Sequence, residues 1–171
     1  MNRLYKELTI SSSLENMTQV EKFIEEISDL YYIHNSYFGN ILLAVEEAVI
    51  NAIRHGNKMD ESKNVQITFT GNRNGLMFKI EDEGEGFDSK DIPNPLETDD
   101  NNTDSIGKGI FLIRSLADKV LFNPKGNQVE ISFNISGINH ETTLNRLSLL
   151  HQYFIQDTQI LKTPPAGRAG K

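Results

Sequence analysis

Hydrophobic residues follow two spacings in the first third of the chain, and each predicts its own kind of element. Residues 4–10 alternate between apolar and polar side chains, which predicts a β-strand. Residues 20–31 carry an apolar side chain at every third or fourth position, which predicts an amphipathic helix, and Ser12 with Glu15 has the spacing of a helix-capping box ahead of it. A second helix with a broad apolar face is predicted over residues 37–54.

The pattern changes after Gly56 and Asn57, which predict the end of the second helix because glycine tolerates the left-handed backbone that follows many helices. Alternating residues at 65–69 and 76–80, joined by a turn rich in glycine and asparagine, predict a β-hairpin. Residues 83–109 are polar with little periodicity. A loop this long in a compact domain is more often a functional lid than a plain connector.

The remaining elements complete a domain of the α+β class. A helix over residues 110–117, a short strand over 119–122 and a closing strand over 129–135 follow the polar segment. With the earlier elements they predict a two-layer α/β sandwich, in which helices cover one face of a mostly antiparallel sheet. We expect residues 1–137 to form this domain and residues 138–171 to form a C-terminal extension.

The C-terminal extension has its own pattern of apolar residues. They lie at roughly helical spacing: Leu144, Leu147, Leu150, Phe154 and Leu161. This pattern predicts an amphipathic helix that docks on the domain, on a second copy or on a partner, followed by a disordered end over residues 164–171. A loosely ordered extension with no effect on the functional site is the alternative.

Composition narrows the class of protein. The net charge of -7, without a basic run, argues against a nucleic-acid partner. Cysteine is absent, which excludes disulfides and thiolate metal sites. No apolar run approaches the ~20 residues that a membrane span needs, and the N-terminus lacks the apolar core of a signal peptide. We therefore expect a cytoplasmic protein with no membrane partner.

Three groups of residues carry candidate chemistry, and the first lies on the second helix. Glu47, Asn51 and His55 are four residues apart, which places them on one face, opposite the apolar one. An amide oxygen can ligate Mg²⁺, and a carboxylate one turn away can orient or deprotonate a hydroxyl. Glu46 points about 100° away and is the weaker candidate. Taken alone, the pattern favours a face turned to water.

The second group, Asp82-Glu83-Gly84-Glu85-Gly86-Phe87, directly follows the hairpin. Its glycines let the backbone approach a ligand closely or adopt positive φ, and an Asp at a strand end can accept a hydrogen bond from the exocyclic amine of adenine. The third group, Gly107-Lys108-Gly109, stands immediately before the helix that begins at Ile110. A glycine-rich loop that opens a helix offers backbone N–H groups to phosphate, and Lys108 adds a cation. An acidic turn and a flexible loop end are the respective alternatives.

The order of these groups resembles the N, G1 and G2 boxes of the Bergerat-type (GHKL) ATPases over about residues 4–135. Within that superfamily the chain is most similar to the bacterial anti-sigma-factor serine/threonine protein kinases, whose signature helix carries E-A-x-x-N-A-x-x-H-G, here over residues 47–56. The resemblance implies Mg²⁺ and ATP as cofactors, with Glu47 as general base, Asn51 as the Mg²⁺ ligand and Asp82 as the adenine-reading residue. The remaining candidate nucleotide-binding residues lie in the same motifs: His55, Gly84, Gly86, Phe87, Gly107, Lys108, Gly109 and Ile110.

The resemblance also implies partners: a sigma factor that is bound, a STAS-type antagonist that is phosphorylated, and a second copy in a homodimer. One departure concerns the family's usual Gly-Thr before the last strand, where this chain has Gly126-Asn127-Gln128. Either an amide replaces the threonine hydroxyl in the nucleotide pocket, or that contact is lost. The chain also continues past the last predicted strand, where the family domain normally ends.

Two other functions stay open. The first is a nucleotide-binding regulator that sequesters a partner without phosphorylating it; Glu47 argues for the enzyme, because a pure binder needs no base beside the metal ligand. The second is the ATPase module of a histidine kinase, which requires a phospho-accepting histidine on a dimerising helical hairpin. His34 has no such context.

Overall fold

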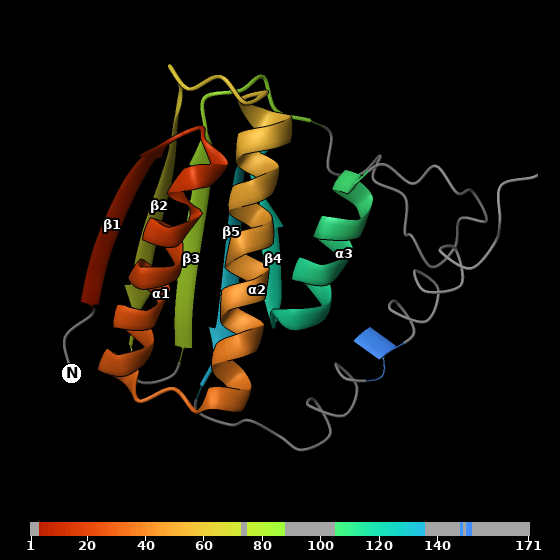
Figure 1. Cartoon of the computed structure of the whole chain (residues 1–171). Helices are drawn as coiled ribbons and strands as arrows, with labels where there is room; N and C mark the ends of the chain where they lie inside the picture. The colour runs from red at the N-terminus through yellow and green to blue at the C-terminus, as the bar shows by residue number, and fades with distance from the viewer. Residues whose placement is uncertain (1–3, 73–74, 88–104, 136–147, 149, 152–171) are drawn as a thin grey trace, which may run out of the picture.

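The chain folds into two layers, a five-stranded sheet with helices α1, α2 and α3 on one face (Figure 1). The structure is a computed structural model that describes residues 4–72, 75–87, 105–135, 148, 150 and 151. The strand order is β1-β2-β3-β5-β4, and all neighbouring strands are antiparallel. The predicted α+β sandwich is confirmed.

The strands follow the alternation in the sequence. β2 and β3 form the predicted hairpin, and their inner face is built from Val65, Ile67 and Phe69 of one strand and Phe78 and Ile80 of the other, all of them buried. The strand bounds are β1 (Leu4–Ser11), β2 (Asn64–Gly71), β3 (Gly75–Asp82), β4 (Lys119–Phe122) and β5 (Gln128–Asn134).

The helices bury the apolar stripes that predicted them. α1 (Met17–Tyr31) and α3 (Ser105–Leu116) flank α2 (Asn35–Asn51), which crosses the middle of the sheet (Figure 1). Val20 and Ile24 of α1 are fully buried, as are Ile41, Val45 and Val49 of α2. Removing each such side chain from water contributes about 1.5–3 kcal/mol, so packing rather than helix propensity holds this layer in place.

The helical segment ends at Gly56 and Asn57 as predicted, but not through a left-handed glycine. The helix passes into a π-helical turn, η2 (Ala52–Gly56), in which the Asn57 N–H donates to the Ala52 carbonyl 2.8 Å away. The left-handed residues come later, at Lys58 and Met59, with φ of 58° and 61°. Buried contacts of Asn57, described below, hold this turn open and override the glycine signal.

Two helix starts also differ from prediction. Ser12 does not cap α1: its hydroxyl is fully buried and donates to the Lys63 carbonyl at 3.0 Å, so it ties the end of β1 to the start of β2. α3 begins at Ser105 rather than Ile110, so Gly107-Lys108-Gly109 lie inside its first turns instead of in a loop before it. Most of the predicted lid, residues 88–104, lies outside the described residues.

Most of the predicted C-terminal helix lies outside the described residues too. The described residues 148, 150 and 151 are helical, and Leu150 is half-buried against the core of the domain. In the described part of the chain, no helix has both the length and the apolar character needed to cross a membrane.

Candidate functional site

A pocket opens between α2, α3 and the end of the sheet where β3 finishes. Its volume is about 120 Å³, several times the ~10–15 Å³ that one water needs, so it can hold part of a larger ligand. Six of the predicted site residues line it: Asn51, His55, Asp82, Gly86, Phe87 and Ile110. Residues of the first two sequence motifs therefore meet at one place, together with Ile110, which directly follows the third motif.

The pocket walls are largely apolar. Ala48 and Ile113 come from the helices, whereas Ile80 and Val129 come from the sheet. Phe87 closes one side, with its ring packed edge-on against Phe122 at 5.5 Å between centroids. A flat aromatic ring such as a nucleobase suits walls of this kind.

Asp82 places a carboxylate in this apolar setting. Its Oδ1 accepts a hydrogen bond from the Gly84 N–H at 2.8 Å. Burial raises the pKa of Asp82 above its ordinary value, although the Gly84 bond opposes this shift. A group that donates to the carboxylate, such as an exocyclic amine, would stabilise its charged form.

The glycines beside Asp82 allow the chain to approach it closely. A Cβ on Gly56 would meet the Asp82 carboxylate, and a Cβ on Gly84 would meet the Gly56 carbonyl. Gly84 thus lies behind Asp82 rather than on the pocket wall. Gly86, with a φ of 81°, lies against the loop before β5. In that loop Gly126 has a φ of 79° and lies against Phe87. Both φ values fall in the region that favours glycine.

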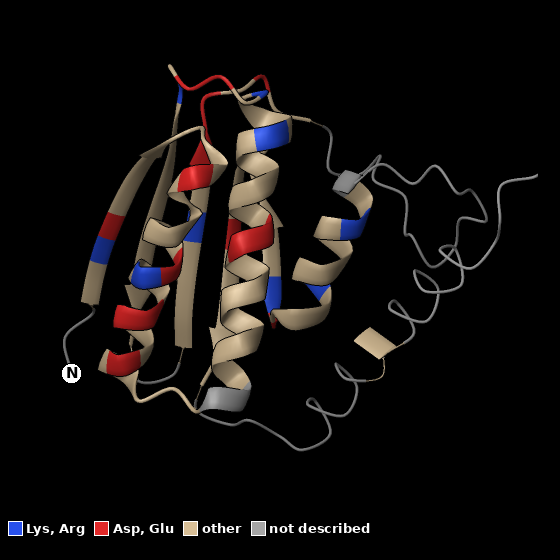
Figure 2. Ribbon diagram, viewed as in Figure 1, with Lys and Arg blue, Asp and Glu red and all other residues tan. Residues whose placement is uncertain are grey.

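Glu47 and Asn51 lie against α3 and are only partly exposed, so this face of α2 is not simply turned to water. Both are half-buried, and a Cβ on Gly109 would lie 2.9 Å from Glu47 Oε2 and 2.8 Å from Asn51 Nδ2. Figure 2 shows the acidic band of α2 at the height where α3 runs alongside. Burial raises the pKa of Glu47, and the charge of Arg54 partly offsets this.

Glu46, the neighbour of Glu47, is turned elsewhere. Its pKa is raised, first by burial and then by the charge of Glu21 on α1 and that of Glu47. The two adjacent carboxylates thus lie toward different helices, Glu46 toward α1 and Glu47 toward α3, as the helix geometry predicts.

Asn51 carries the clearest sign of a missing ligand. Its Nδ2 is buried and, among the described residues, has no hydrogen-bond partner. A buried unpaired amide group is costly, so it points to a group that binds there. The nitrogen can donate to a phosphate oxygen, and a half-turn of the amide offers the oxygen to Mg²⁺ instead. Mg²⁺ commonly takes one or two protein ligands together with phosphate oxygens, so the residues fit a Mg-nucleotide.

The candidate phosphate-binding motif lies in α3, outside the lining of the pocket. Gly107 and Gly109 are buried and Lys108 is half-buried in α3, and none of the three lines the pocket. Glu47 is also outside the lining, beneath the same turn. The structure therefore brings together Asn51, Asp82 and the residues around them, while α3 covers the side of Glu47.

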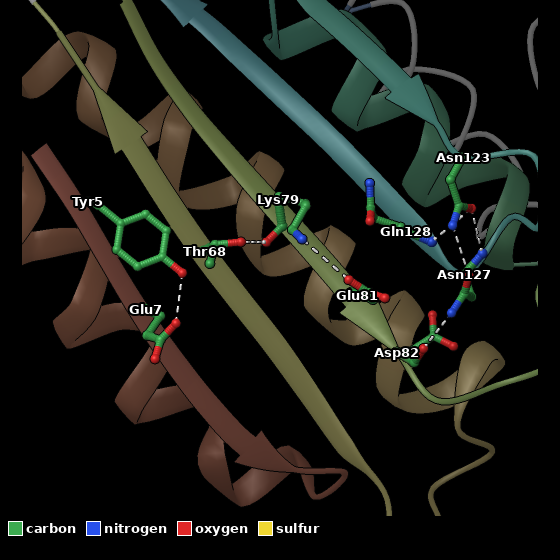
Figure 3. A network of polar contacts seen from close by, with 9 residues as sticks. All are labelled: Tyr5, Glu7, Thr68, Lys79, Glu81, Asp82, Asn123, Asn127 and Gln128. Atoms are coloured by element: carbon green, nitrogen blue, oxygen red, sulfur yellow. Dashed lines mark hydrogen bonds and ion pairs between the residues drawn. The ribbon is translucent and has the colours of Figure 1, made fainter. Parts of the chain in front are cut away.

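Sequence reasoning missed a set of buried asparagines around Asp82. Asn57 is fully buried and accepts a hydrogen bond from the Glu83 N–H, while Asn127 donates from Nδ2 to the Asp82 carbonyl. Figure 3 shows Asn127 between Asp82 and Asn123. The Asn127 amide, at the position where the resemblance expected threonine, bonds to the chain itself. No local pattern marks these residues, because their partners are distant in sequence.

Comparison with known proteins agrees with this geometry. Residues 10–133 match the family model described as the histidine kinase-like ATPase domain. The chain is 31% identical over 114 residues to the serine-protein kinase RsbW of Bacillus subtilis, covering 61% of this chain and 71% of that protein. It is 30% identical over 105 residues to an anti-sigma F factor of Clostridium perfringens, covering 61% and 67% respectively.

A solved structure supports the fold alone. The crystal structure of the RsbU and RsbW domains of a Mycobacterium tuberculosis protein has a TM-score of 0.52 at 13% identity and covers 78% of this chain. This chain spans 32% of the length of that one. On the family match and the two curated relatives, the chain belongs to the histidine kinase-like ATPase family and, within it, to the anti-sigma-factor serine/threonine protein kinases.

Proposed function

We propose that the chain binds Mg-ATP in the pocket between α2, α3 and β3. The observation that carries this proposal is the pairing of an acceptor carboxylate, Asp82, at the apolar end with the buried unpaired amide of Asn51. Asp82 accepts from the adenine amine, and Asn51 holds the cation. The bound Mg-ATP supplies the phosphoryl group and neutralises its charge.

We further propose that the chain phosphorylates a protein serine or threonine. Glu47, one turn from Asn51, would take the proton from the attacking hydroxyl. The hydroxyl oxygen would form the new bond to the terminal phosphorus of ATP as the bond from that phosphorus to the bridging oxygen breaks and ADP leaves. The raised pKa of Glu47 makes it a stronger base than an exposed glutamate. For this step the first turns of α3 must shift, because Gly109 packs directly on the Glu47 carboxylate.

The partners we propose rest on the names of two relatives and on the family resemblance seen in the sequence. A serine-protein kinase and an anti-sigma F factor are among the similar proteins. We infer that this chain binds a sigma factor and phosphorylates a STAS-type antagonist in the cytoplasm, as a homodimer.

A second candidate is an ATP-binding regulator that sequesters its partner without catalysis. The covering of Glu47 by α3 favours this alternative, since the base is closed off from the pocket in this conformation.

Incubation with labelled ATP and a STAS-domain protein from the same genome separates the two candidates. The kinase transfers label to a serine or threonine of that protein, and Glu47→Gln slows the transfer by roughly 100-fold or more. Mg-dependent ATP binding with no transfer, together with capture of a sigma factor, would favour the regulator. Absence of ATP binding by calorimetry would refute both.

A further inference from the structure

Asn127 holds both backbone polar groups of Asp82. Its Nδ2 donates to the Asp82 carbonyl at 2.7 Å, and its own carbonyl accepts from the Asp82 N–H at 3.0 Å. Asn127 is 8% exposed. Asp82 therefore sits at the end of β3 with its main chain fixed from the β5 side (Figure 3).

The Asn127 side chain is itself fixed. Its Oδ1 accepts from Asn123 Nδ2 at 2.9 Å, so both ends of the amide are bonded to the chain. Asn123 Oδ1 in turn accepts from the N–H groups of Gly126 and Asn127, at 2.7 and 3.1 Å. Asn127 also lines the pocket, but the polar atoms of its amide are turned toward Asn123 and Asp82.

Asn57 holds the backbone of the next residue, Glu83. It is fully buried, and its Oδ1 accepts from the Glu83 N–H at 2.9 Å. Its Nδ2 donates to Ser12 Oγ at 2.7 Å and to the Asn64 carbonyl at 2.9 Å. Asn57 thus links the end of α2, through η2, to β1, β2 and the residue after Asp82.

We propose that Asn57 and Asn127 are positioning residues that fix the Asp82 carboxylate for the exocyclic amine of adenine, and so set the preference for ATP over GTP. This inference rests on the proposed function. The two amides hold the backbone of consecutive residues, 82 and 83, which fixes the main-chain position from which the Asp82 side chain projects. The remaining Asp82 constraint is local, from the Gly84 N–H.

If Asn57 and Asn127 act through Asp82, their loss weakens the recognition of adenine but leaves the contacts with phosphate unchanged. Asn127→Ala, in the turn before β5, is expected to lower the ratio of ATP to GTP affinity about tenfold, the scale of one lost positioned hydrogen bond. Asn57→Ala is expected to lower the same ratio. Calorimetry with Mg-ATP and Mg-GTP measures both ratios, and thermal melts report folding.

Asn16→Ala is the matched control. Asn16 also donates from its amide to backbone and hydroxyl oxygens of Ser11, at 3.1 and 2.9 Å, but it lies outside the pocket lining. Its loss is expected to lower the melting temperature without changing the affinity ratio. If Asn57→Ala fails to fold, Ser12→Ala removes one acceptor of the Asn57 amide, and Asn127→Ala tests the proposal by itself.

A double-mutant cycle with Asp82→Asn tests whether the asparagines act through Asp82. In the Asp82→Asn background, Asn127→Ala is expected to change the affinity ratio by less than twofold. An undiminished effect in that background, or an unchanged ratio in the single variants, would overturn the inference. A wild-type chain that fails to prefer ATP would instead refute the proposed reading of adenine by Asp82.

Discussion

At the scale of the residue, the two carboxyl groups proposed to act on the nucleotide are both held where charge is unfavourable. Burial is the first cause of the raised pKa of Asp82 and of Glu47. A carboxyl whose pKa is raised by folding destabilises the folded protein when it is ionised. The two carboxyl groups therefore lower the stability of the folded protein when they are ionised.

This cost is testable at Asp82. Asp82→Asn keeps an acceptor for the Gly84 N–H and removes the buried charge, so we expect a higher melting temperature at pH 7 without nucleotide. Because the folded pKa lies above the ordinary ~3.9, the stability from protonating Asp82 is present at low pH and lost as pH rises. The advantage of the variant should therefore shrink toward pH 4. Thermal melts across pH 4–8 measure it, and a lower, pH-independent melting temperature would contradict it.

The adjacent glutamates give a second test. Glu47→Gln should leave Mg-ATP affinity nearly intact and slow phosphoryl transfer by roughly 100-fold or more, whereas Asn51→Ala should weaken Mg-nucleotide binding. Glu46→Gln is the matched control and should do much less, because Glu46 lies near Glu21 of α1. Single-turnover transfer and calorimetry separate the two effects. A more damaging Glu46→Gln would mean that Glu46, not Glu47, serves the site.

Some of the site residues could be predicted from the sequence and others could not. Asn51, Asp82 and Phe87 were predicted because they stand in short local motifs, and they do line the pocket. Asn57 and Asn127 were not predicted as supports: each bonds a partner 45 residues away, Ser12 and Asp82 respectively. Such pairs depend on how strands and helices are brought together, which spacing along the chain does not encode.

At the scale of the element, the contact between α2 and α3 depends on one glycine. Gly109→Ala would place a methyl group 2.8 Å from Asn51 Nδ2 and 2.9 Å from Glu47 Oε2. Both atoms end side chains that can move aside, so we expect little loss of stability. The displaced amide and carboxylate should slow phosphoryl transfer by roughly 10–100-fold. Transfer assays beside thermal melts measure both outcomes.

Gly39→Ala provides the comparison. Gly39 is also within a helix, α2, but a Cβ there meets nothing within 4 Å. We expect this variant to gain about 0.5–1 kcal/mol of stability from helix propensity with unchanged transfer. Equal activity in the two variants would show that α3 does not need its close approach to Glu47.

Elements were predictable where side-chain periodicity determines them and not where tertiary packing does. The alternation of β2 and β3 and the apolar stripe of α1 gave those elements to within a few residues. The start of α3 was missed because its glycines have low helix propensity, which suggested a loop. In the fold Gly109 lets α3 lie against Glu47 and Asn51 of α2, within a helix that begins at Ser105.

At the scale of the whole molecule, the C-terminal extension is the part that the family resemblance does not cover. Leu150 is half-buried against the core. Leu150→Ser should therefore lower stability by about 1–2 kcal/mol, while Ser148→Ala, at an exposed position, should leave it unchanged. Urea unfolding measures both.

Truncation after Gly137 extends this test to the docking prediction for the whole segment. We expect a lower melting temperature, a changed oligomeric mass or a weaker partner affinity, depending on the surface that the segment covers. All three values unchanged would favour a loosely ordered extension without a role.

The π-helical turn at the end of α2 has a consequence for how one helix serves both ends of a nucleotide. The Asn57 N–H reaches back five residues, to Ala52, so the turn holds one residue more than an α-helical turn. That residue shifts the angular phase of everything after it by about 100°. Glu47 and Asn51 come before the extra residue, and their side chains lie against α3. Asn57 comes after it, and its side chain lies against the end of β3. Deleting the exposed Arg54 should restore a single phase, leaving Asn51, the proposed metal ligand, in place while uncoupling it from the proposed recognition of adenine by Asp82.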